Sequence, residues 1–135
     1  RQEIHRLLLV LQRARVRVVL ETPRKPGAAA EWDHLARTMR IRPDVPDQGT
    51  VDFAQVLNHE AIHVAQSCAS GSLRTPPRVL GLSTEIDPEA EQHLHQPLYA
   101  GTSELERRLE KEAYANQDRL GLGVSLVEAH CPLTG

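Results

Sequence analysis

Apolar residues recur at helical spacing in the first and central parts of the chain. An apolar stripe along residues 2–13 predicts an amphipathic helix. The stripe consists of Ile4, Leu7, Leu8 and Leu11. A longer helix is predicted to begin near Thr50, a suitable N-cap residue, and to run to about Ala69. Gly71 follows where glycine commonly ends a helix.

Capping signals predict two further helices. An Asp-Pro pair predicts a short helix over residues 88–94, because proline is favoured at the first helical position. Ser103 and Glu106 form a capping box. The helix that they open is predicted to reach Leu120, where glycines end it, and the residues beyond are predicted to form a tail.

Two short segments have the alternating pattern of strands. Residues 15–22 are rich in β-branched residues, and residues 37–43 alternate Met39 and Ile41 with polar residues. We expect both in one small, largely antiparallel sheet, with the second as a candidate edge strand. The predicted fold class is therefore α+β, with this sheet packed on the long central helix and on the helix after Ser103.

Length and composition limit the chain to one compact domain, residues 1–135. The formal net charge of -2 and the scattered basic residues argue against nucleic-acid binding. No apolar run is long enough to cross a membrane. Cys68 and Cys131 allow at most one disulfide, so a reducing, cytoplasmic setting is the simpler expectation. The start at Arg1 leaves a removed leader open, and the oligomeric state is not determined by the sequence.

The stretch VLNHEAIHVAQSC, residues 56–68, contains the pattern H-E-x-x-H. On a helix, His59 and His63 lie one turn apart on the same face and can bind one cation. Glu60 lies about 100° around the helix from His59. It cannot easily be a ligand there, but it can act as a general base on a metal-bound water. Two zinc ligands and a base are therefore predicted.

The surroundings of the two histidines favour a site over a chance match. Most of this helix is apolar, and one polar stripe lies within about 40° of His59. The stripe contains Asp52, Gln55, His63 and Gln66. A buried polar stripe needs partners, and a metal would supply them. Gln66, one turn after His63, is a candidate to support a metal ligand from outside or to contact the cleft or the loop that follows.

A catalytic zinc site needs a third protein ligand, for which the helix after Ser103 offers carboxylates. Relative to the apolar face of that helix, Glu112 lies at roughly 65°, Glu110 at roughly 95° and Asn116 at roughly 25°. Glu112 therefore points inward more than Glu110 does, and it is the preferred candidate.

The two motifs HEAIH and EAYAN together resemble the gluzincin zinc metallopeptidases, and the size resembles their minimal single-domain members. The resemblance implies that His59, His63 and Glu112 bind zinc and that Glu60 is the base. Asn116 would stand where the family has an aspartate that braces a histidine, and an uncharged brace would lower ligand basicity. A variant of the family pattern would use Glu110 instead of Glu112.

The expected function is zinc-dependent hydrolysis of peptide bonds in a peptide or protein substrate. Strand 37–43 would pair with an extended substrate, and Arg40 or Arg42 would meet acidic side chains, although solvated arginines are the commoner case. An oxyanion-stabilising group would come from His93, His95 or Tyr99, with no choice among them. The alternatives are a catalytically silent, zinc-stabilised module that binds a partner protein and a latent protease with a blocked site.

Overall fold

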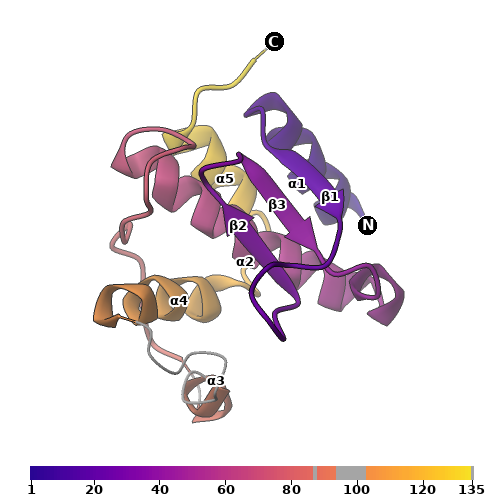
Figure 1. The fold of residues 1–135 in the computed structure, drawn as a ribbon, viewed down its shortest axis with the longest axis vertical. Helices are drawn as coiled ribbons and strands as arrows, with labels where there is room; N and C mark the ends of the chain where they lie inside the picture. The colour runs from indigo at the N-terminus through magenta and orange to yellow at the C-terminus, as the bar shows by residue number, and fades with distance from the viewer. Residues whose placement is uncertain (87, 94–102, 135) are drawn as a thin grey trace.

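A computed structural model describes residues 1–86, 88–93 and 103–134 (Figure 1). In this part of the chain a three-stranded sheet lies over α1 and α2, and α5 packs against both of these helices. The α+β class is confirmed. The elements are α1 (Gln2–Arg13), β1 (Arg17–Leu20), β2 (Ala30–Asp33), β3 (Thr38–Ile41), the 3-10 helix η1 (Val45–Gln48), α2 (Thr50–Ser70), α3 (Pro88–His93), α4 (Glu104–Asn116) and α5 (Leu122–His130).

The sheet is mixed rather than largely antiparallel. Its strand order is β1-β3-β2, with β1 parallel and β2 antiparallel to β3. The prediction that the segment containing β3 lies at an edge is wrong, because β3 occupies the centre. The error came from missing β2, whose sequence AEWD is short and half acidic.

β2 forms because its two faces meet different partners. Trp32 pairs with Met39, which is fully buried in the core. On the other face, Glu31 and Asp33 hold Arg40, which is only 5% exposed, at 3.0 and 2.9 Å. Burial on its own would raise the pKa of Asp33, but the hydrogen bond and charge of Arg40 bring it below its ordinary value. A buried arginine in β3 therefore requires acidic residues in its neighbour.

The core lies between the sheet and the helices. It combines apolar side chains from α1, β3, α2 and α5, which share near-complete burial. They include Leu7, Leu11, Met39, Ile41, Leu57, Ala61, Val64 and Val127. This packing makes α2 the central element of the fold. No helix among the described residues has the length and apolar character that a membrane span requires.

The C-terminal segment is the helix α5, not the predicted tail, and α4 ends at Asn116 rather than at Leu120. Gly123 was expected to help end a helix but lies within α5, where it touches α2. A Cβ atom there would lie 2.3 Å from Asn58 Oδ1, so only glycine permits this close approach. The Gly123 N–H donates to the same oxygen at 2.8 Å.

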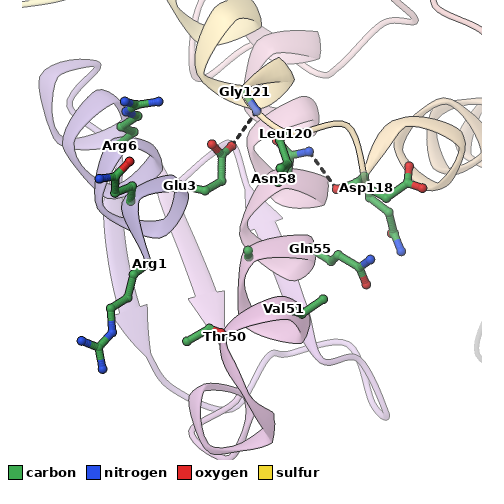
Figure 2. Close-up of a pocket in the computed structure, with 13 residues that line it drawn as sticks. Arg1, Glu3, Arg6, Thr50, Val51, Gln55, Asn58, Asp118, Leu120 and Gly121 are labelled. Carbon is green, nitrogen blue, oxygen red and sulfur yellow. Dashed lines mark hydrogen bonds between the residues drawn. The ribbon is translucent and has the colours of Figure 1, made fainter.

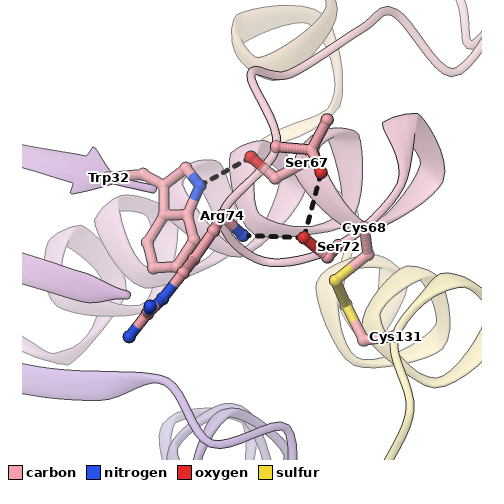
Figure 3. Close-up of a disulfide and its surroundings, with 7 residues drawn as sticks. Trp32, Ser67, Cys68, Ser72, Arg74 and Cys131 are labelled. Carbon is pink, nitrogen blue, oxygen red and sulfur yellow. Dashed lines mark hydrogen bonds between the residues drawn. A yellow bond between two sulfur atoms is a disulfide. The ribbon is translucent and has the colours of Figure 1, made fainter. Parts of the chain in front are cut away.

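A disulfide joins the far end of α2 to the end of α5 (Figure 3). Cys68 and Cys131 are 63 positions apart in the sequence. Closing a loop of this length restricts the unfolded chain and stabilises the fold by about 4 kcal/mol in the chain-entropy account.

We expect the double variant Cys68→Ser, Cys131→Ser to lose about 4 kcal/mol of unfolding free energy in urea titrations. A reducing agent should destabilise the wild type by a similar amount and leave the double variant unchanged. Equal stability of the oxidised wild type and the double variant would contradict the stabilising role of the bridge.

Candidate metal centre

The middle of α2 brings His59, Glu60 and His63 together, as the motif predicted. One ligand atom from each of the three lies within 4.8 Å of the others, so the group can hold a metal ion. His59 and Glu60 are 7% and 6% exposed. Such buried polar groups need partners, and the carboxylate of a second helix supplies one.

That carboxylate belongs to Glu110 of α4. Its Oε1 lies 2.5 Å from His63 Nε2 and 3.3 Å from His59 Nε2. The two imidazole nitrogens are themselves 3.2 Å apart. Three possible ligand atoms from two helices therefore converge on one point.

Glu112 does not lie at this point, which corrects the preferred choice of third ligand. Its inward direction was predicted correctly, because the side chain is 1% exposed. Its oxygens, however, accept hydrogen bonds from the backbone N–H groups of Leu80, Gly81 and Leu82 at 2.7, 2.9 and 2.9 Å. Glu110 and Glu112 lie about 200° apart around α4 and so face opposite sides of it.

Both histidines are braced by side-chain amides. The Nδ1–H of His63 donates to Gln66 Oε1 at 2.7 Å, and that of His59 donates to Gln117 Oε1 at 2.9 Å. These bonds leave both Nε2 atoms directed at Glu110. Because amide oxygens carry no net charge, the braces raise ligand basicity less than carboxylates would.

Asn116, the expected brace, is buried elsewhere: its amide donates to Ser83 O at 2.9 Å and to Glu112 O at 2.8 Å. Sequence reasoning missed Gln117, which takes this role at the end of α4. A signal was present, because Glu110 and Gln117 are seven residues apart and therefore share one face of a helix.

Burial and charge shift the titration of this cluster. Burial on its own would lower the pKa of His63, but the Glu110 carboxylate raises it to about 9. Burial would likewise raise the pKa of Glu110, and the two histidines hold it well below its ordinary value. Burial raises the pKa of Glu60, and the nearby histidines oppose this only in part. Without a metal, His63 and Glu110 thus form a partly buried ion pair.

The donor set fits zinc. Tetrahedral ligands at zinc–ligand distances of about 2.0–2.1 Å lie about 3.3 Å from one another. The separations of His59 Nε2 from His63 Nε2 and from Glu110 Oε1 are 3.2 and 3.3 Å. His63 Nε2 and Glu110 Oε1 are closer to each other than two zinc ligands would be, because they form a direct ion pair. These two atoms would have to move apart to bind zinc. Glu60 Oε2 stands 3.9 Å from His59 Nε2, beside the cluster.

Two hollows adjoin the cluster, one on each side of Glu60 and Glu110. The first, which we call the Tyr114 hollow, has polar and apolar surface in similar amounts and is lined by Arg42, Gln48, Asp52, Gln55, Val56, His59, Tyr114, Gln117 and the segment 27–30. The second, the Trp32 hollow, is more apolar. Its apolar walls include Ala30, Trp32, Pro76, Pro77, Leu105 and Leu109, and His63 also borders it, together with polar residues that include Lys25, Glu31, His34 and Glu106.

Tyr114 is the aromatic neighbour of His59. It is partly buried and also borders the Tyr114 hollow, with its ring edge-on to that of His59 at a centroid distance of 4.7 Å. Of the proposed oxyanion groups, His93 lies in α3, and His95 and Tyr99 lie outside the described residues. The described contacts therefore do not assign this role.

A third hollow lies away from the metal centre, between α1, the first turns of α2 and the segment after α4 (Figure 2). Arg1, Val51 and Leu120 line it, and it shares only Gln55 and Gln117 with the Tyr114 hollow. It contains none of the four residues of the cluster, which are His59, Glu60, His63 and Glu110, so we do not assign it as the reactive site.

Comparison of the chain with protein-family models, with curated proteins and with solved structures finds no match. The gluzincin resemblance therefore rests on the H-E-x-x-H spacing of His59, Glu60 and His63, because Glu112 and Asn116 of the second motif lie elsewhere.

Proposed function

We propose that the chain is a zinc-dependent peptidase. The observation that carries this proposal is the convergence of His59, His63 and Glu110 on one point, with the Glu60 carboxylate beside it. Three ligands and a separate carboxylate base form the donor set of a catalytic zinc site rather than of a closed structural one. The resident metal would therefore be zinc, held by these three residues.

Bound zinc would polarise the scissile carbonyl and acidify an attacking water. Glu60 would accept the proton of that water and pass it to the leaving amine. The burial of Glu60 supports this role. A general base works best when its pKa lies near the pH of the reaction, and burial raises the pKa of Glu60 in that direction. Gln66 and Gln117 would hold the two imidazoles so that their Nε2 atoms stay directed at the metal.

An extended substrate would pair with β2. This replaces the prediction for residues 37–43, since β3 is hydrogen-bonded on both sides. Arg42 N–H donates to Ala29 O, so alternation along the strand turns the peptide groups of Ala30 and Trp32 away from β3. Ala30 borders both hollows and Trp32 borders the Trp32 hollow, so a peptide lying in the hollows would run beside these groups.

The arginines predicted to meet acidic substrates have different surroundings. Arg40 is buried against Glu21, Glu31 and Asp33 and cannot reach a substrate. Arg42 lines the Tyr114 hollow and is paired with Asp44. Only Arg42 keeps a position from which it can contact a substrate.

Replacing Glu60 with Gln tests the proposal. We expect Glu60→Gln to bind zinc with the wild-type stoichiometry and to cleave peptides about 10²–10⁴-fold more slowly, because the general base is lost and the ligands are not. The measurements are zinc content by elemental analysis and cleavage of a mixed peptide library by mass spectrometry.

Three outcomes of this experiment separate the alternatives. Wild-type protein that lacks stoichiometric zinc would contradict the metal site itself. Stoichiometric zinc without cleavage would favour the zinc-stabilised binding module. Cleavage that appears only after a limited proteolytic cut would favour a latent protease.

We also infer an oxidising compartment for this chain. The cytoplasmic expectation assumed unpaired cysteines, whereas Cys68 and Cys131 are joined, and such bridges persist mainly outside reducing compartments. Free thiols at both positions in protein isolated under alkylating conditions would contradict this inference.

A further inference from the structure

We propose that this peptidase cleaves after a large apolar residue, whose side chain occupies the Trp32 hollow. This inference rests on the proposed function and goes beyond it by naming the substrate class. It depends on two observations: the unequal chemistry of the two hollows and the direction of β2 between them.

The two hollows offer different surroundings to a substrate. In the Trp32 hollow, the side chains of Trp32, Pro77, Leu105 and Leu109 form apolar walls next to His63 and Glu60. The Tyr114 hollow is bordered instead by small residues and by polar side chains such as those of Arg42, Gln48 and Gln117. An apolar side chain can therefore bury more apolar surface, and gain more free energy, in the Trp32 hollow than in the Tyr114 hollow.

The walls of the Trp32 hollow are fixed by the fold. The Trp32 indole N–H donates to Ser67 Oγ of α2 at 2.9 Å, which holds the ring in one orientation (Figure 3). Leu109 is 8% exposed and packed within the protein, whereas Leu105 at the rim is 51% exposed. The hollow is thus formed before a ligand arrives, and Leu105 has surface left to bury against one.

The direction of β2 decides which side of the scissile bond enters this hollow. The start of β2 lies between the hollows, because Ala28 and Ala30 border both, whereas Trp32 and His34, further along the strand, border the Trp32 hollow and not the Tyr114 hollow. Antiparallel pairing is the more stable arrangement for an added strand. An antiparallel peptide would run the opposite way, with its amino-terminal half over the Trp32 hollow. The residue before the scissile bond therefore faces the apolar walls.

Trp32 is the only tryptophan of the chain, so its emission reports occupation of the hollow directly. We would titrate zinc-loaded Glu60→Gln with acetyl-Ala-Ala-Phe-Ser-Ala-amide and with the peptide that has Ala in place of Phe. We expect the Phe peptide to change the Trp32 emission and to bind at least about tenfold more tightly, the usual discrimination of an apolar pocket.

A pair of variants tests the walls. Leu105→Ser should weaken binding of the Phe peptide by about fivefold or more and leave that of the Ala peptide unchanged, because only the larger side chain reaches the rim. Leu9→Ser is the matched control: Leu9 is 47% exposed on α1 and borders neither hollow, so its replacement should change neither value.

Cleavage by the wild type separates the two proposals. Zinc-dependent and Glu60-dependent cleavage after Phe supports both. Cleavage with no preference for Phe over Ala, or faster cleavage of acetyl-Ala-Ala-Ser-Phe-Ala-amide before its Phe, overturns this inference and leaves the proposed function standing. Absence of any such cleavage, together with unchanged Trp32 emission, overturns both.

Discussion

Glu110→Gln is expected to abolish stoichiometric zinc binding and peptide cleavage. Glu110 supplies the only carboxylate oxygen that lies within 3.3 Å of both histidines among the described residues. Loss of a residue that merely braces a ligand costs about 10–100-fold in metal affinity, so loss of a direct, charged ligand should cost more than about 100-fold. Competition with a chromophoric zinc chelator measures the affinity.

Glu112→Gln is the matched control, because it makes the same chemical change two residues along the same helix. Its carboxylate faces the loop at residues 80–82, and it reaches the histidines only through Gln66. Zinc affinity should fall by no more than about tenfold in this variant. Retained zinc in Glu110→Gln, with zinc lost in Glu112→Gln, would contradict the assignment of the third ligand.

Glu110 and Glu112 show how much of the site could be predicted from the sequence. The H-E-x-x-H spacing fixed the relation of His59 to His63, because one turn of helix determines it. The helical wheel also identified Glu112 as buried. It could not identify the partner, since an inward carboxylate can satisfy backbone N–H groups as well as a cation.

The parts of the fold that were missed depend on contacts between distant segments. In β2, Glu31 and Asp33 form ion pairs with Arg40 of β3. Local strand propensity does not reveal this pairing. Gly123 looked like a helix terminator because its role, close contact with Asn58 of α2, exists only in the folded chain. Elements whose apolar residues repeat at a regular spacing were predictable, whereas elements that depend on contacts with a distant segment were not.

Glu112→Ala should be among the most destabilising substitutions in this chain. The Glu112 carboxylate accepts three backbone N–H bonds from residues 80–82 and one from the Gln66 amide, which in turn braces His63. Each donor left unsatisfied costs about 1–3 kcal/mol, with water recovering part of this at the partly exposed loop. We expect a net loss of about 4 kcal/mol in urea unfolding at pH 7, a large fraction of the stability of an ordinary domain.

Two further variants keep this expectation testable if Glu112→Ala does not fold. Glu112→Gln retains one acceptor oxygen and should lose only about 1–2 kcal/mol. Arg108→Ala, at an exposed position in the middle of α4, should change stability by less than about 0.5 kcal/mol. Hydrogen exchange at the amides of Leu80, Gly81 and Leu82 should accelerate in Glu112→Gln and not in Arg108→Ala. Unchanged exchange at these amides in Glu112→Gln would mean that Glu112 does not anchor the loop.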